Sequence, residues 1–327
     1  MSEPLLSVVI ATVNNSEACN LTTASIISQL EYDEIPYEII LLDNNSTEEE
    51  KKLLEQFLRF HKDYPIKFYN YDILGTIPIF SFGVTQAKGK YIAMAEPHLI
   101  FAPHYYKTMI ESYEALNFSF GKNIKMLYSP FMTGSVGRKN DDYIFEHDIG
   151  RNNPLGPFGR MSGLGLGGKL GEEPKSIFGN IFCGMVCEKE WLLKIGNMFP
   201  EAFKEFGGYI AESFVFCLST WLMGGECWIE PKVAIHHPVY RISKGVGRSE
   251  RMFESMALAA YIFGGEKYML GMPKQWGAYG EETFEKCRKY GKEPREFLLK
   301  NAKYTLDEFC EKWPTIKEAG KEEIKNV

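Results

Sequence analysis

The sequence lacks the features that mark membrane-spanning, secreted and nucleic-acid-binding proteins. Its longest apolar runs, such as LLSVVIAT, are far shorter than the roughly 20 residues that cross a bilayer. No charged segment followed by an apolar core precedes them, so we expect no signal peptide. The formal net charge of −6 gives no overall attraction to nucleic acid.

The cysteines also form no recognisable pattern. There are 7 of them, an odd number, and they are scattered along the chain, which argues against a disulfide framework. Cys183 and Cys187 have no second pair at a spacing typical of zinc sites, so we expect them to be small core residues. We therefore expect a protein of the reducing cytoplasm.

What the chain does contain is a long alternation of strand-like and helix-like segments. With 327 residues and 45% hydrophobic content it can bury a large core. Over the first hundred residues, β-branched apolar runs alternate with segments of helical periodicity, which predicts a parallel sheet with right-handed crossovers. The expected strands are 5–12, 34–43, 66–71 and 88–98, and the expected helices are 17–31, 47–62 and 75–87.

Polar side chains stand where these strands end. Thr12 and Asn14 follow the first strand, Asp43 ends the second, and Glu96 and His98 end the fourth. In such sheets, ligands bind beyond the carboxyl ends of the strands. We therefore expect these side chains to converge on one edge.

The second half of the chain is organised differently. A glycine-rich segment at 129–180 is expected to be a long loop, either a lid or simply disordered. A strand and a short helix follow, then a helix at 211–223 that Gly224 and Gly225 end, and then a strand running into His236 and His237. We divide the chain into an α/β domain at 1–245 and a helical C-terminal extension at 246–327.

The segment Glu96-Pro97-His98 raises the question of a metal site. Residues i and i+2 of an extended segment point to the same side, so the carboxylate and the imidazole could share a divalent cation. The alternative is an exposed strand end with two unrelated polar residues.

The order of motifs resembles known glycosyltransferases. VVIATVNN followed by EIILLDNNSTEE is similar to the opening of family 2 glycosyltransferases of the GT-A fold. The second half resembles the polypeptide N-acetylgalactosaminyltransferases, with Trp221-Leu222-Met223-Gly224-Gly225, Pro231 six residues before His237, and Glu212 nine residues before Trp221. The resemblance covers about residues 5 to 241.

This chain departs from the second family at two motifs. Glu96 stands where that family has the aspartate of an Asp-X-His motif, and Gly207-Gly208 lies three residues further from Glu212. No lectin-like domain follows the catalytic region.

The resemblance implies transfer of a sugar from a UDP-sugar to a hydroxyl group with the help of Mn²⁺ or Mg²⁺. Glu96, His98 and His237 would hold the metal, a mixed oxygen and nitrogen set that suits Mn²⁺. His236 is the alternative to His237 as a ligand: adjacent strand residues face opposite ways, so only one of the two can reach the metal. Glu212 would orient the acceptor hydroxyl or take its proton. The nucleotide would be bound by Thr12, Asn14, Asp43 and Arg241, although Asp43 could instead be a turn residue.

Several alternatives stay open at this point. The N-acetylgalactosaminyl family implies retention of anomeric configuration, whereas the family 2 opening implies inversion with Glu212 as base. A nucleotidyltransferase would need a basic, glycine-rich loop after the first strand, which ATVNNSEACN lacks. A non-catalytic nucleotide-sugar binder would not need all four of Glu96, His98, Glu212 and His237.

The sugar and the acceptor are also open. The donated sugar could be a hexose or an N-acetylhexosamine. The acceptor could be a saccharide, a lipid-linked or protein hydroxyl, or a hydroxymethylated DNA base, because the C-terminal helical region is locally basic. The sequence does not indicate an oligomeric state.

Overall fold

A computed structural model of the chain describes residues 3–73, 75–119, 124–133, 143–144, 164–165, 173–176, 183–196, 199–208, 211–237, 248–271 and 280–311. The strands are β1 (Leu6–Thr12), β2 (Tyr37–Asp43), β3 (Ile66–Asn70), β4 (Tyr91–Ala95), β5 (Ile100–Phe101), β6 (Met126–Thr133), β7 (Tyr143–Ile144), β8 (Leu164–Gly165), β9 (Lys175–Ser176), β10 (Val186–Glu188) and β11 (Glu226–His236). The helices are α1 (Ser16–Tyr32), α2 (Glu48–Phe60), α3 (Thr76–Gln86), α4 (Tyr105–Ser119), α5 (Lys189–Gly196), α6 (Phe199–Phe203), α7 (Ala211–Leu222), α8 (Arg248–Gly264), α9 (Glu266–Leu270) and α10 (Glu281–Asn301).

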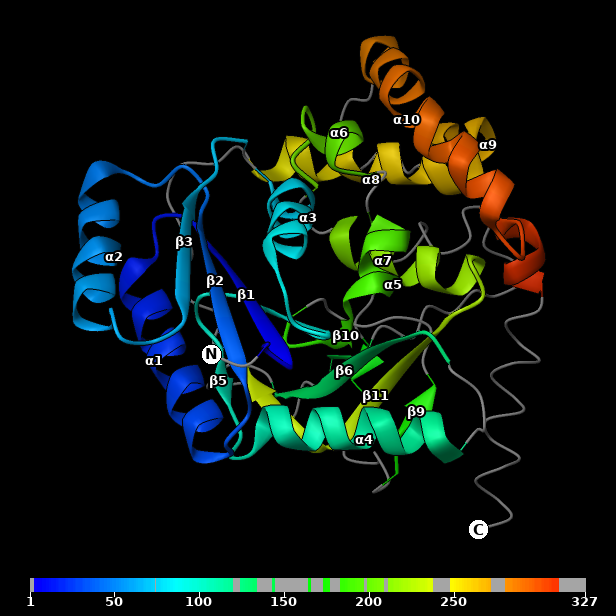
Figure 1. Cartoon of the computed structure of the whole chain (residues 1–327). Helices are drawn as coiled ribbons and strands as arrows, with labels where there is room; N and C mark the ends of the chain where they lie inside the picture. Colours follow the sequence, from blue (N-terminus) through cyan, green and yellow to red (C-terminus); the bar gives the residue numbers. More distant parts are fainter. Residues whose placement is uncertain are drawn as a thin grey trace.

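In the described part of the chain the main sheet has nine strands (Figure 1). Eight of them follow the order β3-β2-β1-β4-β10-β6-β11-β5, and the ninth, β9, also pairs with β11. Strands β3, β2, β1 and β4 are parallel to one another, and β6 is parallel to β11. Strand β10 is antiparallel to both of its neighbours, β4 and β6. The carboxyl ends of β1, β2, β4, β6 and β11 therefore all lie at the same edge of the sheet.

Helices cover both faces of this sheet, which explains why its central strands are almost continuously apolar. In β1, Val8 and Ile10 pack into the core layer shared with α1 and α4, whereas Val9 packs into the layer shared with α3, α5 and α7. Figure 1 shows these two layers, with α8 and α10 lying outside the second one. Helices α8 and α10 pack against each other and extend the second layer, and α10 also contacts α6.

The sequence-based prediction of an α/β fold with a helical C-terminal region is confirmed. The expected elements of the first hundred residues all form, with bounds that differ by a few residues. One difference concerns the segment 129–180, expected to be a loop: its first residues, 129–133, form the second half of β6 in the middle of the sheet. These residues, Ser-Pro-Phe-Met-Thr, precede the glycine-rich run, and their pairing with β11 makes them part of the sheet. Most of the rest of that segment, and Arg241, lie outside the described residues.

None of the helices in the described ranges is long and apolar enough to cross a membrane.

Candidate metal centre

A cluster of one carboxylate and two imidazoles lies at the carboxyl edge of the sheet. Glu96 directly follows β4, and His237 directly follows β11, three positions away in the sheet order. Between them lies His98, in the turn that leads from β4 to β5. Because β5 pairs with the last residues of β11, the turn that carries His98 is drawn against the end of β11.

The three side chains are in mutual contact. The Oε2 atom of Glu96 lies 2.8 Å from Nε2 of His237 and 3.2 Å from Nε2 of His98. The two Nε2 atoms are 3.2 Å apart. One ligand atom from each residue lies within 4.8 Å of the others, so a single cation could be held by all three. The set of one oxygen and two nitrogen atoms matches what Mn²⁺ accepts.

The electrostatics of the cluster follow from its partial burial. Burial alone would raise the pKa of Glu96, but hydrogen bonds and charge from His237 and His98 outweigh it and hold the pKa of this carboxyl well below its usual range. Burial alone would lower the pKa of His237, but Glu96 reverses the effect and the pKa of His237 is raised. Glu96 is therefore ionised at neutral pH and ready to bind a cation.

Cys183 also belongs to this neighbourhood, which the sequence analysis did not foresee. Its Sγ atom lies 2.8 Å from Oε1 of Glu96, and its side chain is buried. Burial and the charge of Glu96 raise the pKa of Cys183 well above its ordinary value, so the thiol is protonated and donates to the carboxylate. The sequence offered no local signal for this contact, because it arises from the pairing of β10 with β4.

The residues expected to bind a nucleotide lie at the same edge. Thr12 and Asp43 are register partners at the ends of β1 and β2, and both are buried. Asp43 uses Oδ2 to accept a hydrogen bond from the backbone N–H of Ser46, whereas its buried Oδ1 has no hydrogen-bond partner among the described residues. The side chain of Asn14 instead accepts from the backbone of Thr47, so it shapes the turn before α2.

Glu212 lies in the first turn of α7 and is tied to the start of α3. Its Oε2 atom accepts a hydrogen bond of 3.1 Å from the hydroxyl of Thr76, which also donates to the carbonyl of Gly208 at 2.8 Å. The charge of Glu212 is a smaller contribution to the raised pKa of Cys183, after burial and the Glu96 carboxylate. The hydrogen bonds of Thr76 therefore hold Glu212 between the start of α3 and the first turn of α7.

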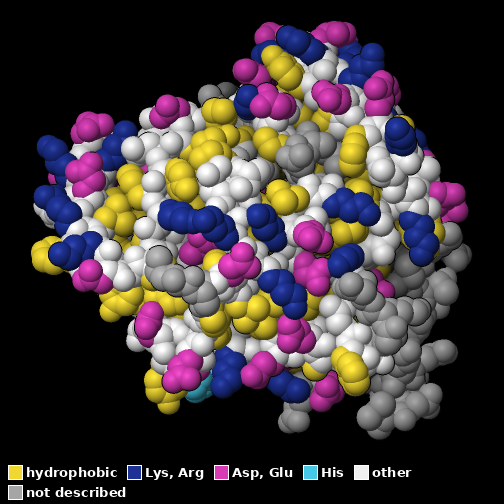
Figure 2. Space-filling model, viewed as in Figure 1, with side chains coloured by type: hydrophobic (Ala, Val, Ile, Leu, Met, Phe, Trp, Pro, Cys, Tyr) yellow, Lys and Arg dark blue, Asp and Glu magenta, His cyan; other side chains and the backbone are white. Residues whose placement is uncertain are grey.

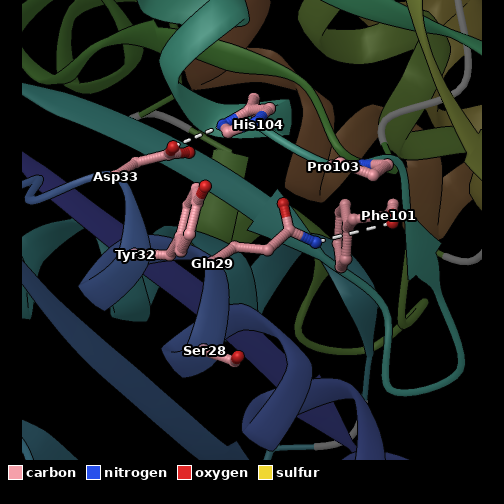
Figure 3. A pocket seen from close by; sticks show the side chains of 7 residues that line it. All are labelled: Ser28, Gln29, Tyr32, Asp33, Phe101, Pro103 and His104. Carbon is pink, nitrogen blue, oxygen red and sulfur yellow. Dashed lines mark hydrogen bonds and ion pairs between the residues drawn. The ribbon is translucent and has the colours of Figure 1, made fainter.

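A separate hollow of about 390 Å³ lies between α1 and the segment before α4 (Figure 3). Its lining residues are Ser28, Gln29, Tyr32, Asp33, Phe101, Pro103 and His104. The polar groups bond one another: His104 pairs with Asp33 at 2.6 Å, and Gln29 donates to the carbonyl of Phe101 (Figure 3). None of these residues belongs to the metal cluster, and we assign no function to the hollow.

Comparison with known proteins gives a consistent result. Residues 7–125 match the model of the family described as Glycosyl transferase family 2. No curated protein matches the sequence.

Similar solved structures cover most of the chain at low sequence identity. The crystal structure of GalNAc-T7 with UDP, GalNAc and Mn²⁺ is 16% identical in sequence and superposes with a TM-score of 0.62. The match covers 91% of this chain and 56% of the GalNAc-T7 chain. TarS from S. aureus is 13% identical and has a TM-score of 0.51, and the match covers 87% of this chain and 42% of the TarS chain. A TarS structure in complex with UDP-GlcNAc, also 13% identical, covers 87% and 71% with a TM-score of 0.50.

The chain spans about half the length of the first two of these proteins. At these identities the likeness concerns the fold, and it agrees with the family match of the first strands and helices. The resemblance seen in the sequence is thereby confirmed: the chain has the GT-A fold of glycosyltransferases, and its residues 7–125 carry the pattern of glycosyl transferase family 2.

Proposed function

We propose that the protein is a glycosyltransferase that moves a sugar from a UDP-sugar to an acceptor hydroxyl with the help of Mn²⁺ or Mg²⁺. The observation that carries the proposal is the contact of Glu96, His98 and His237 at the carboxyl edge of the sheet, where Asp43 also lies. The choice of UDP-sugar is supported by GalNAc-T7, crystallised with UDP, GalNAc and Mn²⁺, and by TarS, crystallised with UDP-GlcNAc. Both also support an N-acetylhexosamine over a plain hexose.

In this proposal Asp43 recognises the nucleoside. The free Oδ1 atom of this buried carboxylate can accept a hydrogen bond from uracil or ribose, which would satisfy an atom that has no partner among the described residues. Thr12 is its neighbour in the sheet, and Asn14 holds the adjoining turn. Arg241 is proposed to contact the diphosphate.

The proposed metal ligands are Glu96, His98 and His237. We choose His237 over His236 because the Nε2 atom of His237 contacts Glu96. When bound, the cation offsets the negative charge that develops on the diphosphate leaving group. The protein supplies a carboxylate that is ionised at neutral pH and two imidazoles that Glu96 already orients.

Glu212 is the proposed catalytic carboxylate. The hydroxyl of Thr76 holds its carboxylate at the start of α7. There it would orient the acceptor hydroxyl or take its proton. Proton abstraction by Glu212 belongs to an inverting reaction, whereas orientation alone suits a retaining one. The anomeric configuration of the product, read from its proton NMR coupling constant, distinguishes the two.

For the acceptor we favour a saccharide or protein hydroxyl over a nucleic acid base. Arg288 of α10, which made this region look basic, forms ion pairs of 2.6 to 2.8 Å with Glu266, Glu281 and Glu285. Lys286 pairs with an acid one turn away. Figure 2 shows acidic and basic side chains intermingled over the α10 end of the visible face. Because these basic groups are paired with acids, less of their positive charge is left for phosphate groups. The proposal includes a cytoplasmic location, in keeping with seven free cysteines.

The test is a calorimetric titration of UDP into the protein with Mn²⁺ and then with excess chelator. We expect binding that the chelator abolishes, followed by release of UDP from a UDP-sugar when acceptors are screened. Binding that ignores the chelator would refute the metal ligands. Absence of binding to UDP, together with binding to another nucleotide, would refute the donor class.

A further inference from the structure

The backbone of Cys183 is fixed opposite the end of β4. The N–H of Gly184 donates to the carbonyl of Met94 at 2.6 Å, and the N–H of Met94 donates to the carbonyl of Met185 at 3.1 Å. These two bonds continue the antiparallel pairing of β10 with β4 up to the residue next to Cys183. The position of the thiol beside Glu96 therefore follows from the sheet itself.

Gly184 strengthens this placement. Its φ of +73° favours glycine, and an added Cβ would lie 2.8 Å from the hydroxyl of Tyr105 and 3.1 Å from Ile235. The hydroxyl of Tyr105 also donates to the carbonyl of Gly184. The backbone hydrogen bonds of Gly184 and the small space around it therefore hold the segment that carries Cys183.

The two oxygens of Glu96 have different partners as a result. Oε2 contacts both imidazoles, at 2.8 and 3.2 Å, whereas Oε1 accepts from the thiol of Cys183 at 2.8 Å. Among the described residues, Cys183 is not part of the group whose ligand atoms lie within 4.8 Å of one another. Its thiol therefore contacts the carboxylate without joining the ligand set.

We propose that Cys183 is a positioning residue that occupies Oε1 of Glu96, so that the carboxylate presents Oε2 alone to the cation. This inference rests on the proposed function, because it requires a divalent cation at Glu96, His98 and His237. A glutamate is long and flexible, and about a third of the Glu96 side chain is accessible to solvent. A donor on its second oxygen is what keeps such a side chain in one orientation.

The consequence is a selectivity for small cations. Ca²⁺ takes six to eight oxygen ligands and often binds both oxygens of a carboxylate, whereas Mg²⁺ demands a compact octahedral shell. A glutamate restricted to one oxygen, beside two imidazoles, thus favours Mn²⁺ over Ca²⁺. Removing the thiol frees Oε1 and should weaken this preference.

The experiment measures metal binding directly, without turnover. Mn²⁺ is titrated calorimetrically into the wild-type protein and into Cys183→Ala, Cys183→Val and Cys183→Ser, and the titrations are repeated in competition with Ca²⁺. We expect Cys183→Ala and Cys183→Val to bind Mn²⁺ about 10- to 100-fold more weakly, with a smaller preference over Ca²⁺. Cys183→Ser, which keeps a donor, should bind more tightly than either. Valine fills the place of the thiol with apolar atoms and leaves no cavity, so it serves if the alanine variant is unstable.

Cys187 provides the matched control. It is buried in β10, four positions after Cys183, but its thiol faces the carbonyl of Glu188 at 3.5 Å rather than Glu96. Cys187→Ala should therefore bind Mn²⁺ as the wild type does. Equal Mn²⁺ affinity and equal Ca²⁺ competition in Cys183→Val and Cys187→Ala would overturn the inference while leaving the proposed function intact. A wild-type protein that binds no divalent cation would instead overturn the metal ligands themselves.

Discussion

The backbone of Gly75 lies close against that of Gly207, and replacing Gly75 by alanine should be strongly destabilising. Gly75 has a φ of +139°, and a Cβ added there would lie 2.0 Å from the carbonyl oxygen of Gly207 and 2.4 Å from its Cα atom. The atoms it would meet are backbone, so no side chain can move aside. The N–H of Gly75 also donates to Asn44 at the end of β2, which holds the turn from the other side.

The magnitude follows from two terms. Backbone strain at such a φ destabilises the folded state by about 1–3 kcal/mol, and overpacking adds about 1–3 kcal/mol. We therefore expect Gly75→Ala to lower the free energy of unfolding by about 2–6 kcal/mol. Urea denaturation followed by tryptophan fluorescence measures this quantity.

Gly280 is the matched control. It precedes α10 with a φ of −92°, and an added Cβ would meet no atom within 4 Å. Gly280→Ala should change the free energy of unfolding by no more than about 1 kcal/mol, because alanine restricts the unfolded chain but is a poorer N-cap for α10 than glycine. If the free energies of unfolding of Gly75→Ala and Gly280→Ala differ by less than about 0.5 kcal/mol, the close contact between Gly75 and Gly207 does not constrain this turn.

Three further predictions concern the site and the sheet. His98→Ala should abolish the Mn²⁺-dependent part of UDP binding, measured by calorimetry, while the circular dichroism spectrum stays that of the wild type; retained metal dependence would exclude His98 as a ligand. Glu212→Gln should leave the affinity for UDP near wild type but slow the transfer reaction severely, and an unchanged rate of UDP release would exclude a catalytic role. Glu38 is buried and bonded to Ser7, Lys67 and the backbone of Lys88, and these bonds outweigh burial, so that its pKa is lowered. A carboxylate with a lowered pKa stabilises the fold fully only at pH values above its ordinary pKa, which is 4.5 for Glu38. Glu38→Gln should therefore lower the free energy of unfolding by about 1–3 kcal/mol at neutral pH. That difference should shrink as the pH falls below the ordinary pKa, and equal stability losses at neutral and acidic pH would contradict this assignment.

The parts of the fold that were predictable from sequence are those set by local patterns. Alternating strands and helices gave the direction of the first four strands, and hence the edge at which Asp43 and Glu96 end. The proline-to-histidine spacing, supported by family resemblance, pointed to His237, and the contact of its Nε2 atom with Glu96 agrees with that choice over His236.

The parts that could not be predicted depend on contacts between distant segments. Nothing in the sequence around Cys183 indicates that β10 inserts antiparallel between β4 and β6, yet only that insertion places the thiol beside Glu96. The hydrogen bond between Thr76 and Glu212 likewise joins residues 136 positions apart. The pairing of Arg288 in α10 could not be predicted either, because one of its acids, Glu266, comes from a different helix.

The separation of His98 and His237 along the chain bears on how the protein unfolds. The two imidazoles touch although they are 139 positions apart in the chain, so a cation bound by both would act as a reversible cross-link that closes a long loop. At a cation concentration 100 times the dissociation constant, such a cross-link adds about 2.7 kcal/mol to the free energy of unfolding. Divalent cations should therefore slow proteolysis throughout β6, α7 and β11, the elements between the two histidines, and a chelator should restore cleavage there.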